Sequence, residues 1–418
     1  LNCLSFSLSL MSLRLRSKRD WGRLDMGYET YRIADLIDEI AMGPFGSNIK
    51  VSCFVDSGVP VLNGSNLEGF SLSEKTFRYV TREKADSLNK ANAHRGDIVI
   101  THRGTLGQIV FIPQDSKYDR YVISQSQFRV RCNDKVLPEY LVYYFHTPIG
   151  QHKLLSNASQ VGVPALARPS STFQQIEVVL PELSIQKRVV EIISTIQKKI
   201  VNNQELNDNL LAQAQTLYKQ FFPYGVQDDL PDGWRIGTVG EIIEIHDSKR
   251  IPLSGADRSK MEKKIYPYYG AASLMDLVDN YIFDGKYLLL GEDGTVVDDA
   301  GYPILQYVWG QFWVNNHAHI LTGRLGYDVE SLYMLFKQTP VKSIVTGAVQ
   351  PKISQANLRS VQVVIPPEHN LREYNDLVEP LFSLFRANEE ECKTFTALRD
   401  TLLPKLMSGE IDVSAVQL

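Results

Sequence analysis

Two long stretches of the chain carry apolar residues at helical spacing. Between residues 184 and 222, apolar positions recur at intervals that suit one helix face: Ile185, Val189, Ile192, Ile196, Leu206, Leu210 and Leu217. A second stripe near the end of the chain comprises Val378, Leu381, Phe385, Cys392, Phe395 and Leu402. Both have the spacing of a coiled-coil seam, so we predict two long helices.

Polar side chains interrupt both predicted seams. Lys199 and Asn203 do so in the first helix and Asn388 in the second; a buried polar position can fix helix register at some cost in stability. Pro380 is expected near the first turn of the second helix or at a kink, and Pro404 with Gly409 is expected to end that helix. We expect the two helices to pair. The alternative is that each packs only on its own domain.

The rest of the chain contains an internal sequence repeat, in which two copies are offset by about 190 residues. The copies open at residues 31–33 and 234–236, which read Tyr-Arg-Ile and Trp-Arg-Ile. The same features then follow in the same order in both copies. A strand that begins with glycine lies at 96–100 and 285–289, a Gly-Thr pair at 104–105 and 294–295, and a short strand signal at 122–127 and 314–319. Each copy continues with a short helix, ending near Phe145 or Phe336, and closes with a strand at 176–181 or 361–366. The preserved order indicates an internal duplication.

The pattern predicts an α+β fold, with two similar mixed α/β domains joined by two long helices that pair as an antiparallel coiled coil. A polar, turn-rich segment at 228–233 separates the copies. The antiparallel direction follows if a pseudo-two-fold axis relates the halves. The expected order is a tail at 1–27, the first domain at 28–182, a helix at 183–223, a linker at 224–233, the second domain at 234–367, a helix at 368–410 and a tail at 411–418.

Composition narrows the class of protein. Of the 418 residues, 44% are hydrophobic and 22% are charged, which is typical of globular proteins and excludes disordered and collagen-like classes. The net charge of -4 argues against a generally basic nucleic-acid binder, so any positive surface must be local. Residues 249–264 form such a basic stretch, or alternatively a solvated loop. The four cysteines show no CxxC spacing, so a metal ribbon or disulfide framework is not indicated and a cytoplasmic location is expected.

The beginning of the chain does not resemble a secretory signal. Its apolar, Ser-rich run precedes Arg14 and Arg16, whereas such a signal carries its positive charge first. We expect residues 1–20 to be a loose tail, produced by an over-extended start upstream of Met11. No apolar run reaches the roughly 20 residues that a bilayer span requires.

The familiar catalytic motifs are not found in the sequence. There is no P-loop, dinucleotide fingerprint, HExxH, GxSxG or Asn-Pro-Pro-aromatic signature. The carboxylates between Glu292 and Asp299 suggest a polar turn more than a metal site. His317 and His319 alternate on one predicted strand, which is compatible with a metal pair, but no third ligand is evident. No bound metal or cofactor is expected.

Several segments resemble the specificity subunit of type I restriction-modification enzymes. Residues 43–47 (Gly-Pro-Phe-Gly-Ser) and 58–64 with Asn66 are similar to segments of target recognition domains in that family. Residues 180–186 resemble the junction at which the family's spacer helix begins, and residues 402–411 resemble the end of its second helix. Residues 366–371 depart from the junction pattern because they lack its Gln.

The resemblance implies a non-catalytic reader of double-stranded DNA. In such systems each target recognition domain reads one half of an interrupted target, and the paired helices set the distance between the halves. Two modification (methyltransferase) subunits dock against the helices, and a restriction (translocase and nuclease) subunit completes the complex. S-adenosylmethionine, ATP and Mg are then expected on the partner subunits.

Candidate DNA-binding residues are those whose side chains suit base edges or phosphates and stand beside predicted strands. In the first domain they are Lys50, Asn66, Arg78, His102, Arg103, Gln125 and Gln127. In the second they are Lys249, Arg250, Lys260, Lys263, Asn316, His317 and Lys352. Each could instead be an ordinary surface charge or strand polar group. The glycine-rich segments 43–46 and 291–294 could allow a close backbone approach to DNA, or be plain turns.

Two other classes of protein stay open. One is a non-enzymatic adaptor whose duplicated domains bind proteins and whose helices form a coiled coil. The other is a stand-alone hydrolase with a site in residues 292–299. Sequence-selective binding to duplex DNA would separate the reader from the adaptor, and turnover without partners would reveal the hydrolase.

Overall fold

A computed structural model describes residues 28–159, 162–347 and 349–413 of the chain. It contains two compact units: Leu1–Ile200 with Lys393–Leu418, and Val201–Cys392. We call them the first unit and the second unit. The predictions for residues 1–27 and for the last residues of the C-terminal tail lie outside the described residues. In the described part of the chain, every helix is too short or too polar to span a bilayer.

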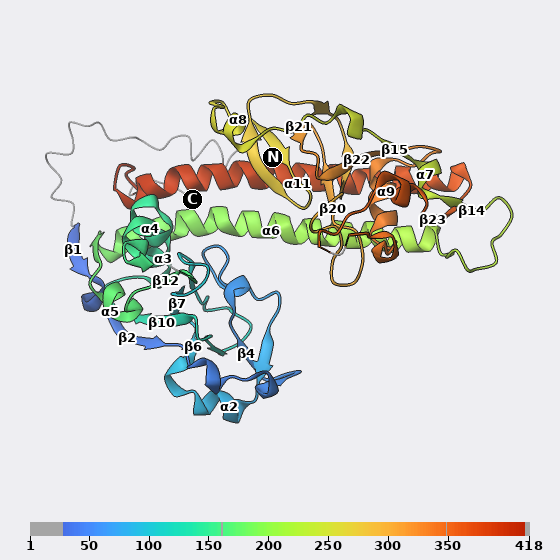
Figure 1. The fold of residues 1–418 in the computed structure, drawn as a ribbon. Helices are drawn as coiled ribbons and strands as arrows, with labels where there is room; N and C mark the ends of the chain where they lie inside the picture. Colours follow the sequence, from blue (N-terminus) through green and yellow to red (C-terminus); the bar gives the residue numbers. More distant parts are fainter. Residues whose placement is uncertain (1–27, 160–161, 348, 414–418) are drawn as a thin grey trace. The chain divides into compact units, whose positions relative to one another are not determined.

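The two predicted long helices are present and pair antiparallel (Figure 1). They are α6 (Leu183–Phe221) and α11 (Glu368–Met407). In the first unit, Arg399 Nη1 donates to Gln197 Oε1 at 2.9 Å. In the second unit, the Tyr374 hydroxyl donates to the Ala214 carbonyl at 3.1 Å. Residues late in α11 thus meet residues early in α6, as expected of an antiparallel coiled coil.

A layer of asparagines lies in the helix seam of the second unit. Asn388 Nδ2 donates to Asn207 Oδ1 at 2.9 Å, and Asn203 Nδ2 donates to Glu391 at 2.6 Å. Asn203 and Asn388 are buried, which confirms their predicted place in the seam, and Asn207 is a third member that the apolar stripe did not reveal. The prediction for Leu206 was wrong, because 42% of this residue is exposed.

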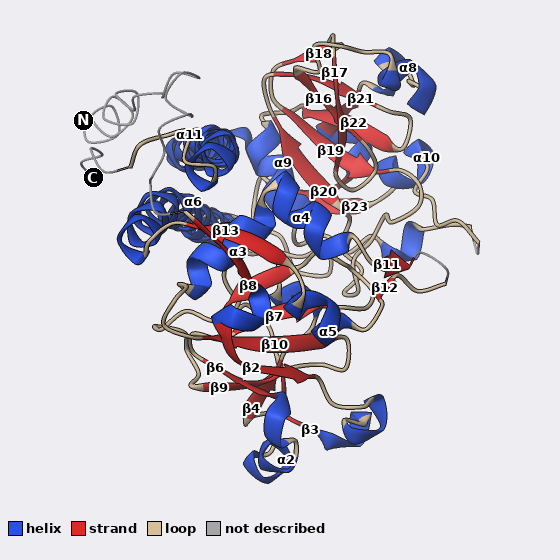
Figure 2. Ribbon diagram, turned by 90° about the vertical axis from the view of Figure 1, so that its left-hand side faces the viewer, coloured by secondary structure: helices blue, strands red, loops and turns tan. Residues whose placement is uncertain are grey.

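Each unit contains the same four-stranded sheet. In the first unit the strand order is β2-β10-β7-β8, and Figure 2 shows the strands in that order. Their bounds are Ile37–Met42, Gln127–Cys132, Ile98–Thr101 and Ile109–Phe111. In the second unit the order is β15-β22-β19-β20, with bounds Ile243–Ile245, Ala318–Gly323, Tyr287–Gly291 and Leu305–Val308. All pairings in both sheets are antiparallel.

A second sheet also recurs, with one parallel pairing at its centre. In the first unit its order is β3-β5-β4-β9-β6, with bounds Phe54–Val55, Arg78–Val80, Val59–Val61, Arg120–Val122 and Asn92–His94. In the second unit it is β17-β16-β21-β18, with bounds Leu274–Val278, Tyr266–Tyr269, Gln311–Val314 and Phe283–Asp284. Pairs β4–β9 and β16–β21 are parallel. The shared topology confirms the duplication.

Short elements complete each unit. Strand pairs β1–β13 (Glu29–Arg32 with Glu177–Leu180) and β14–β23 (Arg235–Thr238 with Gln362–Ile365) join the start of each copy to its closing strand. The small strands β11 (Ala158–Ser159) and β12 (Ala165–Leu166) also pair. The shorter α-helices are α2 (Arg82–Ser87), α3 (Pro138–His146), α4 (Pro148–Leu155), α5 (Pro169–Gln174), α7 (Val239–Ile242), α8 (Gly255–Ser259), α9 (Val329–Phe336) and α10 (Gln355–Arg359).

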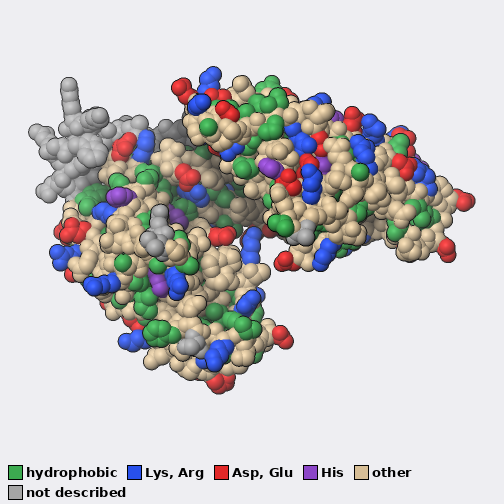
Figure 3. All heavy atoms as spheres, viewed as in Figure 1, with side chains coloured by type: hydrophobic (Ala, Val, Ile, Leu, Met, Phe, Trp, Pro, Cys, Tyr) green, Lys and Arg blue, Asp and Glu red, His purple; other side chains and the backbone are tan. Residues whose placement is uncertain are grey.

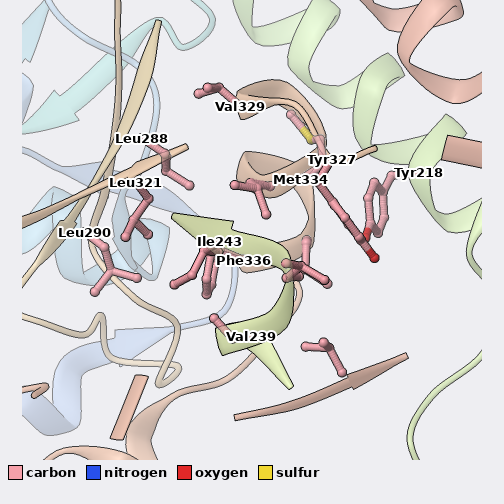
Figure 4. Close-up of a cluster of buried hydrophobic side chains, with 14 of the residues drawn as sticks. Tyr218, Val239, Ile243, Leu288, Leu290, Leu321, Tyr327, Val329, Met334 and Phe336 are labelled. Carbon is pink, nitrogen blue, oxygen red and sulfur yellow. The ribbon is translucent and has the colours of Figure 1, made fainter. Parts of the chain in front are cut away.

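The core of the second unit joins the sheet domain to the long helices. Leu288, Leu290 and Leu321 from the four-stranded sheet belong to one buried cluster with Phe336 of α9 and Tyr218 of α6 (Figure 4). The same cluster contains four residues of α11: Leu371, Tyr374, Val378 and Phe382. The long helices therefore pair with each other, as predicted, and in the second unit they also pack on the sheet domain.

Three local expectations needed correction. Residues 123–126 and 315–317 are turns that join β9 to β10 and β21 to β22, where short strands had been expected. Pro380 lies well inside α11, which excludes the first of its two expected places, the first turn. Helix α11 continues past Pro404 to Met407, and Gly409, with φ of 72°, supplies the left-handed position just after the helix end.

Candidate nucleic-acid interface

Three loops meet where β7 ends and β10 begins, at one end of the central strands of the four-stranded sheet in the first unit. The His102 amide donates to the Ser126 carbonyl at 2.8 Å, and the Leu166 amide donates to the His102 carbonyl at 2.9 Å. The Gly104 amide donates to the Pro164 carbonyl at 2.8 Å. Residues 102–104, 124–126 and 164–166 are thereby held together, and we call them the loop cluster of the first unit.

The second unit repeats this arrangement bond for bond. The Glu292 amide donates to the His317 carbonyl at 2.9 Å, the Ile353 amide to the Glu292 carbonyl at 2.8 Å, and the Gly294 amide to the Pro351 carbonyl at 3.0 Å. Residues 292–294, 315–317 and 351–353 are the loop cluster of the second unit. The side chains of loops can differ between related domains while a rigid scaffold keeps the loop backbone in place. Each loop cluster can therefore present different side chains on the same backbone arrangement.

Six predicted DNA-binding residues lie in the two loop clusters. They are His102, Arg103 and Gln125 in the first unit and Asn316, His317 and Lys352 in the second. Arg103, Gln125, Asn316 and Lys352 are exposed. The structure therefore brings together residues that are far apart in the sequence, although DNA contact by any of them stays a prediction.

His102 presents a neutral ring at pH 7. Burial lowers the pKa of its imidazole, a hydrogen bond to the Gln125 carbonyl raises it, and nearby Arg103 lowers it, with a net fall from the ordinary 6.5. The ring Nε2 lies 3.2 Å from that carbonyl, which accepts, so the neutral ring carries its proton on Nε2. His102 thus suits hydrogen bonding to a base better than charge pairing with a phosphate.

Asn66 and Gln127 lie in the interior, and their surroundings favour a structural role over the predicted base contact. The Asn66 amide donates to the carbonyls of Ser73 and Thr76, both at 3.0 Å. Gln127 Oε1 accepts from the Ser124 amide at 2.9 Å. These side-chain amides bond to backbone groups of loops, which offsets part of the cost of burying them. Gln127 Nε2 is buried without a hydrogen-bond partner among the described residues. We reassign both to loop support.

Lys50 and Arg78 lie outside the loop cluster of the first unit. Both are exposed. Lys50 is in the loop before β3, and Arg78 is on β5 with its guanidinium 5.3 Å from the centre of the Phe54 ring. Within the described residues neither Lys50 nor Arg78 has a carboxylate within ion-pair distance, so both charges are available to a ligand.

Arg250 forms hydrogen bonds and ion pairs within the second unit. Its Nη1 donates to Glu292 at 2.6 Å and to the Ala318 carbonyl at 2.9 Å, and its Nη2 lies 3.3 Å from an Asp247 oxygen. Nη1 also donates to the Asn316 carbonyl at 3.2 Å. Only 14% of the Arg250 side chain is exposed. The guanidinium holds the turn that carries Asn316, so its surroundings favour loop support over the predicted DNA contact.

His317 and His319 do not form a metal pair. His317 lies in the turn before β22 and its Nδ1 is 2.6 Å from Asp293, whereas His319 is buried in β22 with its Nδ1 2.6 Å from Asp247. His319, Asp247 and Glu292 do offer ligand atoms within 4.8 Å of one another. However, Arg250 and Lys352 both bind Glu292, at 2.6 and 3.2 Å. Two cations on one carboxylate favour an ion-pair network over a metal site.

Part of the basic stretch at 249–264 is neutralised. Arg258 and Lys264 pair with Asp276, at 3.1 and 3.5 Å. Lys249, Lys260 and Lys263 are exposed, and no ion pair is found for them in the described part of the chain. Figure 3 shows histidine, acidic and basic side chains gathered on the visible face of the second unit. Three of the predicted lysines thus remain suited to phosphate contact.

Sequence reasoning missed the residues that hold the site together. The sequence did not predict that Asp247 and Glu292 are the partners of Arg250. Nor did it predict a separate role for Phe45, which is 84% exposed and lies in a glycine-rich segment. The nearest available signal was the repeat itself: Phe45 and Lys249 both follow the first strand of their four-stranded sheet. Aligning the segment after β2 with the segment after β15 identifies Phe45 and Lys249 as residues at corresponding places of the two copies.

Comparison with known proteins gives one consistent family. A family model described as the type I restriction modification DNA specificity domain matches residues 27–212 and again residues 231–391. The MjaIX specificity subunit of Methanocaldococcus jannaschii, described as a type I restriction enzyme subunit, is 21% identical over 94% of this chain and 96% of its own. The MjaVIII specificity subunit of the same organism is 18% identical over 77% of this chain and 80% of its own.

The fold has a solved counterpart. The crystal structure of the type I restriction-modification S subunit from M. genitalium superposes with a TM-score of 0.56 at 16% identity, covering 92% of this chain and 97% of that one. At this identity the likeness establishes the fold. Each of the two matched segments contains one of the two copies found by internal comparison and extends into the long helix that follows it.

Proposed function

Because the chain belongs to the type I restriction-modification DNA specificity family, we propose that it is the sequence-reading subunit of a type I restriction-modification complex. Each sheet domain reads one half of a bipartite target in double-stranded DNA. The observation that carries the proposal is the duplicated loop cluster, in which the same backbone bonds display different side chains: His102, Arg103 and Gln125 in one copy, and Asn316, His317 and Lys352 in the other. Such copies suit two different half-sites.

The chemistry of the exposed residues supports this proposal. Side-chain amides such as those of Gln125 and Asn316 suit adenine, and Arg103 suits guanine or a phosphate. Lys50, Lys249, Lys260 and Lys263 suit phosphates, which position a duplex without reading it. Since the net charge is -4, these contacts depend on local placement of charge.

We assign the long helices a spacing and assembly role. A helix of 39 residues is about 58 Å long at 1.5 Å per residue, and a turn of B-DNA is about 34 Å. Sheet domains packed beside the helices would then suit half-sites separated by a gap of about one half to one turn. Two modification subunits dock on the helices and a restriction subunit joins them. These partners bind S-adenosylmethionine, ATP and Mg, and this chain is non-catalytic.

A methylation and binding experiment tests the proposal. The full chain is combined with the modification subunits of its source cell, and methylated adenines are mapped on genomic DNA. We expect a single split target, bound more tightly than a scrambled duplex at physiological salt, with affinity that rises steeply as salt falls. A chain that binds the modification subunits but gives no sequence preference would be an adaptor. Cleavage or turnover by the chain alone would indicate a hydrolase.

A further inference from the structure

A pocket opens beside Gln125 in the first unit. Its volume is about 370 Å³, near the lower end of the range for small-molecule sites. Phe54 and Val61 contribute apolar walls, and Phe45 lines it from the segment between Gly43 and Gly46. Asn63, Arg78 and Gln125 complete its polar part.

The approach of two backbone segments creates this pocket. A Cβ on Gly43 would lie 1.9 Å from the Ser124 carbonyl oxygen, so only glycine allows segment 43–46 to pack against the turn that carries Gln125. A Cβ on Gly46 would meet the Gln125 side chain at 2.2 Å. The glycines therefore place Phe45 and Gln125 on the same cavity.

Three polar groups at the pocket have no partner within the described residues. No hydrogen bond is found there for the Gln125 amide or for Asn63 Nδ2, although Asn63 Oδ1 accepts from Ser65. The Arg78 guanidinium faces only the Phe54 ring, at 5.3 Å. Phe45 is 84% exposed, which leaves apolar surface in water at a cost that a stacked ligand would recover.

This combination is the chemistry of a nucleobase site. Aromatic faces stack on a base, and side-chain amides hydrogen-bond its edge. A guanidinium at the rim can neutralise the phosphate attached to that base. A base inside a duplex offers only its edge, whereas a cavity with an aromatic wall suits a whole ring that has rotated out of the stack.

Resting on the proposed function, we propose that this pocket takes one nucleobase extruded from the half-site read by the first unit. The base stacks on Phe45 and is held by Gln125 and Asn63. Extrusion requires breaking one base pair, so a mismatch at that pair lowers the cost.

The test uses the full chain in its complex with modification subunits and a set of duplexes carrying the mapped target. Each duplex has a mismatch at one position of the half-site. We expect one mismatch to tighten binding about tenfold, because the cost of unpairing is already met. Ile49→Trp, which fills the pocket, should remove this gain. Phe45→Ala, at an exposed position that does not disturb the fold, should reduce the gain at least severalfold.

Ile149→Trp is the matched control, since Ile149 is 65% exposed on α4 and does not line the pocket; it should keep the full gain. A mismatch gain also arises if a modification subunit extrudes a base, but that gain would survive Ile49→Trp. Absence of any gain, or a gain unchanged in both pocket variants, overturns the pocket. Failure of the wild-type complex to prefer its target over a scrambled duplex overturns the proposed function instead.

Discussion

Gln125 and Gln127 stand two positions apart, yet the fold gives them opposite surroundings. Gln125 is exposed on the turn between β9 and β10, beside the pocket that Phe45 lines. Gln127 begins β10 and is fully buried, with Oε1 accepting from the Ser124 amide. The first can meet DNA, whereas the second holds the turn that presents it.

We predict different effects for the two alanine variants. Gln125→Ala should relax preference at one base of the target, at a cost of about 1–3 kcal/mol for the correct base, with thermal stability unchanged. Gln127→Ala should lower the melting temperature, since it leaves the half-buried Ser124 amide without its acceptor. Binding to a panel of single-base target variants, with melting curves for each protein, measures both. Equal loss of preference across all positions in Gln125→Ala would contradict base reading.

The charge cluster of the second unit predicts acid sensitivity. Burial alone would raise the pKa of the Glu292 carboxyl, but its bond to Arg250 and the nearby His319 and Lys352 bring the net pKa below the ordinary value. The pKa of Asp247 is lowered as well, against burial, chiefly by His319. The unfolded chain then binds more protons than the folded one, so this stabilisation is present above the ordinary pKa of these carboxyl groups, about 4 to 4.5, and is lost as the pH falls through their lowered pKa values.

Arg250→Met tests this cluster. We expect it to lower stability at pH 7 by about 3 kcal/mol, because the buried Asp247 and the half-buried Glu292 lose a partner, and to show a smaller further loss on acidification than wild type. Urea unfolding followed by tryptophan fluorescence suits this measurement, since Trp234, Trp309 and Trp313 all lie in the second unit. Lys249→Met, at an exposed neighbour, is the control and should unfold like wild type. A variant as acid-sensitive as wild type would show that Arg250 does not govern these carboxyl groups.

The same residues show where sequence reasoning ends. A glutamine near the start of a strand can face the interior or the solvent. Only the pairing of β10 with β7 places Gln127 in the interior and leaves Gln125 in the exposed turn before the strand. Arg250 looked like one more cation in a basic stretch, because Glu292 is 42 positions away in the sequence. Residue type indicated which side chains can make polar contacts, but whether each side chain faces solvent or the interior depended on backbone far away in the sequence.

At the scale of elements, the seam between α6 and α11 depends on its asparagine layer. Asn388 donates to Asn207, which itself donates to Glu389 at 2.8 Å and to the Phe385 carbonyl at 3.3 Å. Helix length and pairing were predictable because a long apolar period is a strong signal. The full path of the seam was not, because Asn207 is buried in it while the apolar Leu206 faces outward.

We predict non-additive effects for substitutions in this layer. Asn388→Leu alone should destabilise the second unit by about 1–3 kcal/mol, because the Asn207 oxygen is left buried without its donor. Adding Asn207→Leu should recover much of this loss, since two apolar residues can pack where two amides met. Urea midpoints of the two single variants and the double variant complete the cycle. Strict additivity of the two single effects would mean that the amides do not interact.

The whole molecule is a duplicated sheet domain carried on two helices, and the proposed function gives helix length a measurable consequence. Removing four residues at facing positions of α6 and α11 shortens the pair by about 6 Å and rotates the remainder of each helix by about 40°. One base pair of B-DNA corresponds to about 3.4 Å and 36°. The preferred gap between half-sites should therefore shrink by one or two base pairs.

The control deletion removes residues 226–229, which lie between α6 and β14 and leave both helices intact. Each complex is tested for methylation of a library in which the two half-sites are fixed and the gap varies. The linker variant should keep the wild-type gap, whereas the helix variant should select a shorter one with unchanged half-sites. The half-sites stay fixed because the loop clusters are untouched. A helix variant that retains methylation at the original gap would mean that the helices do not set the spacing.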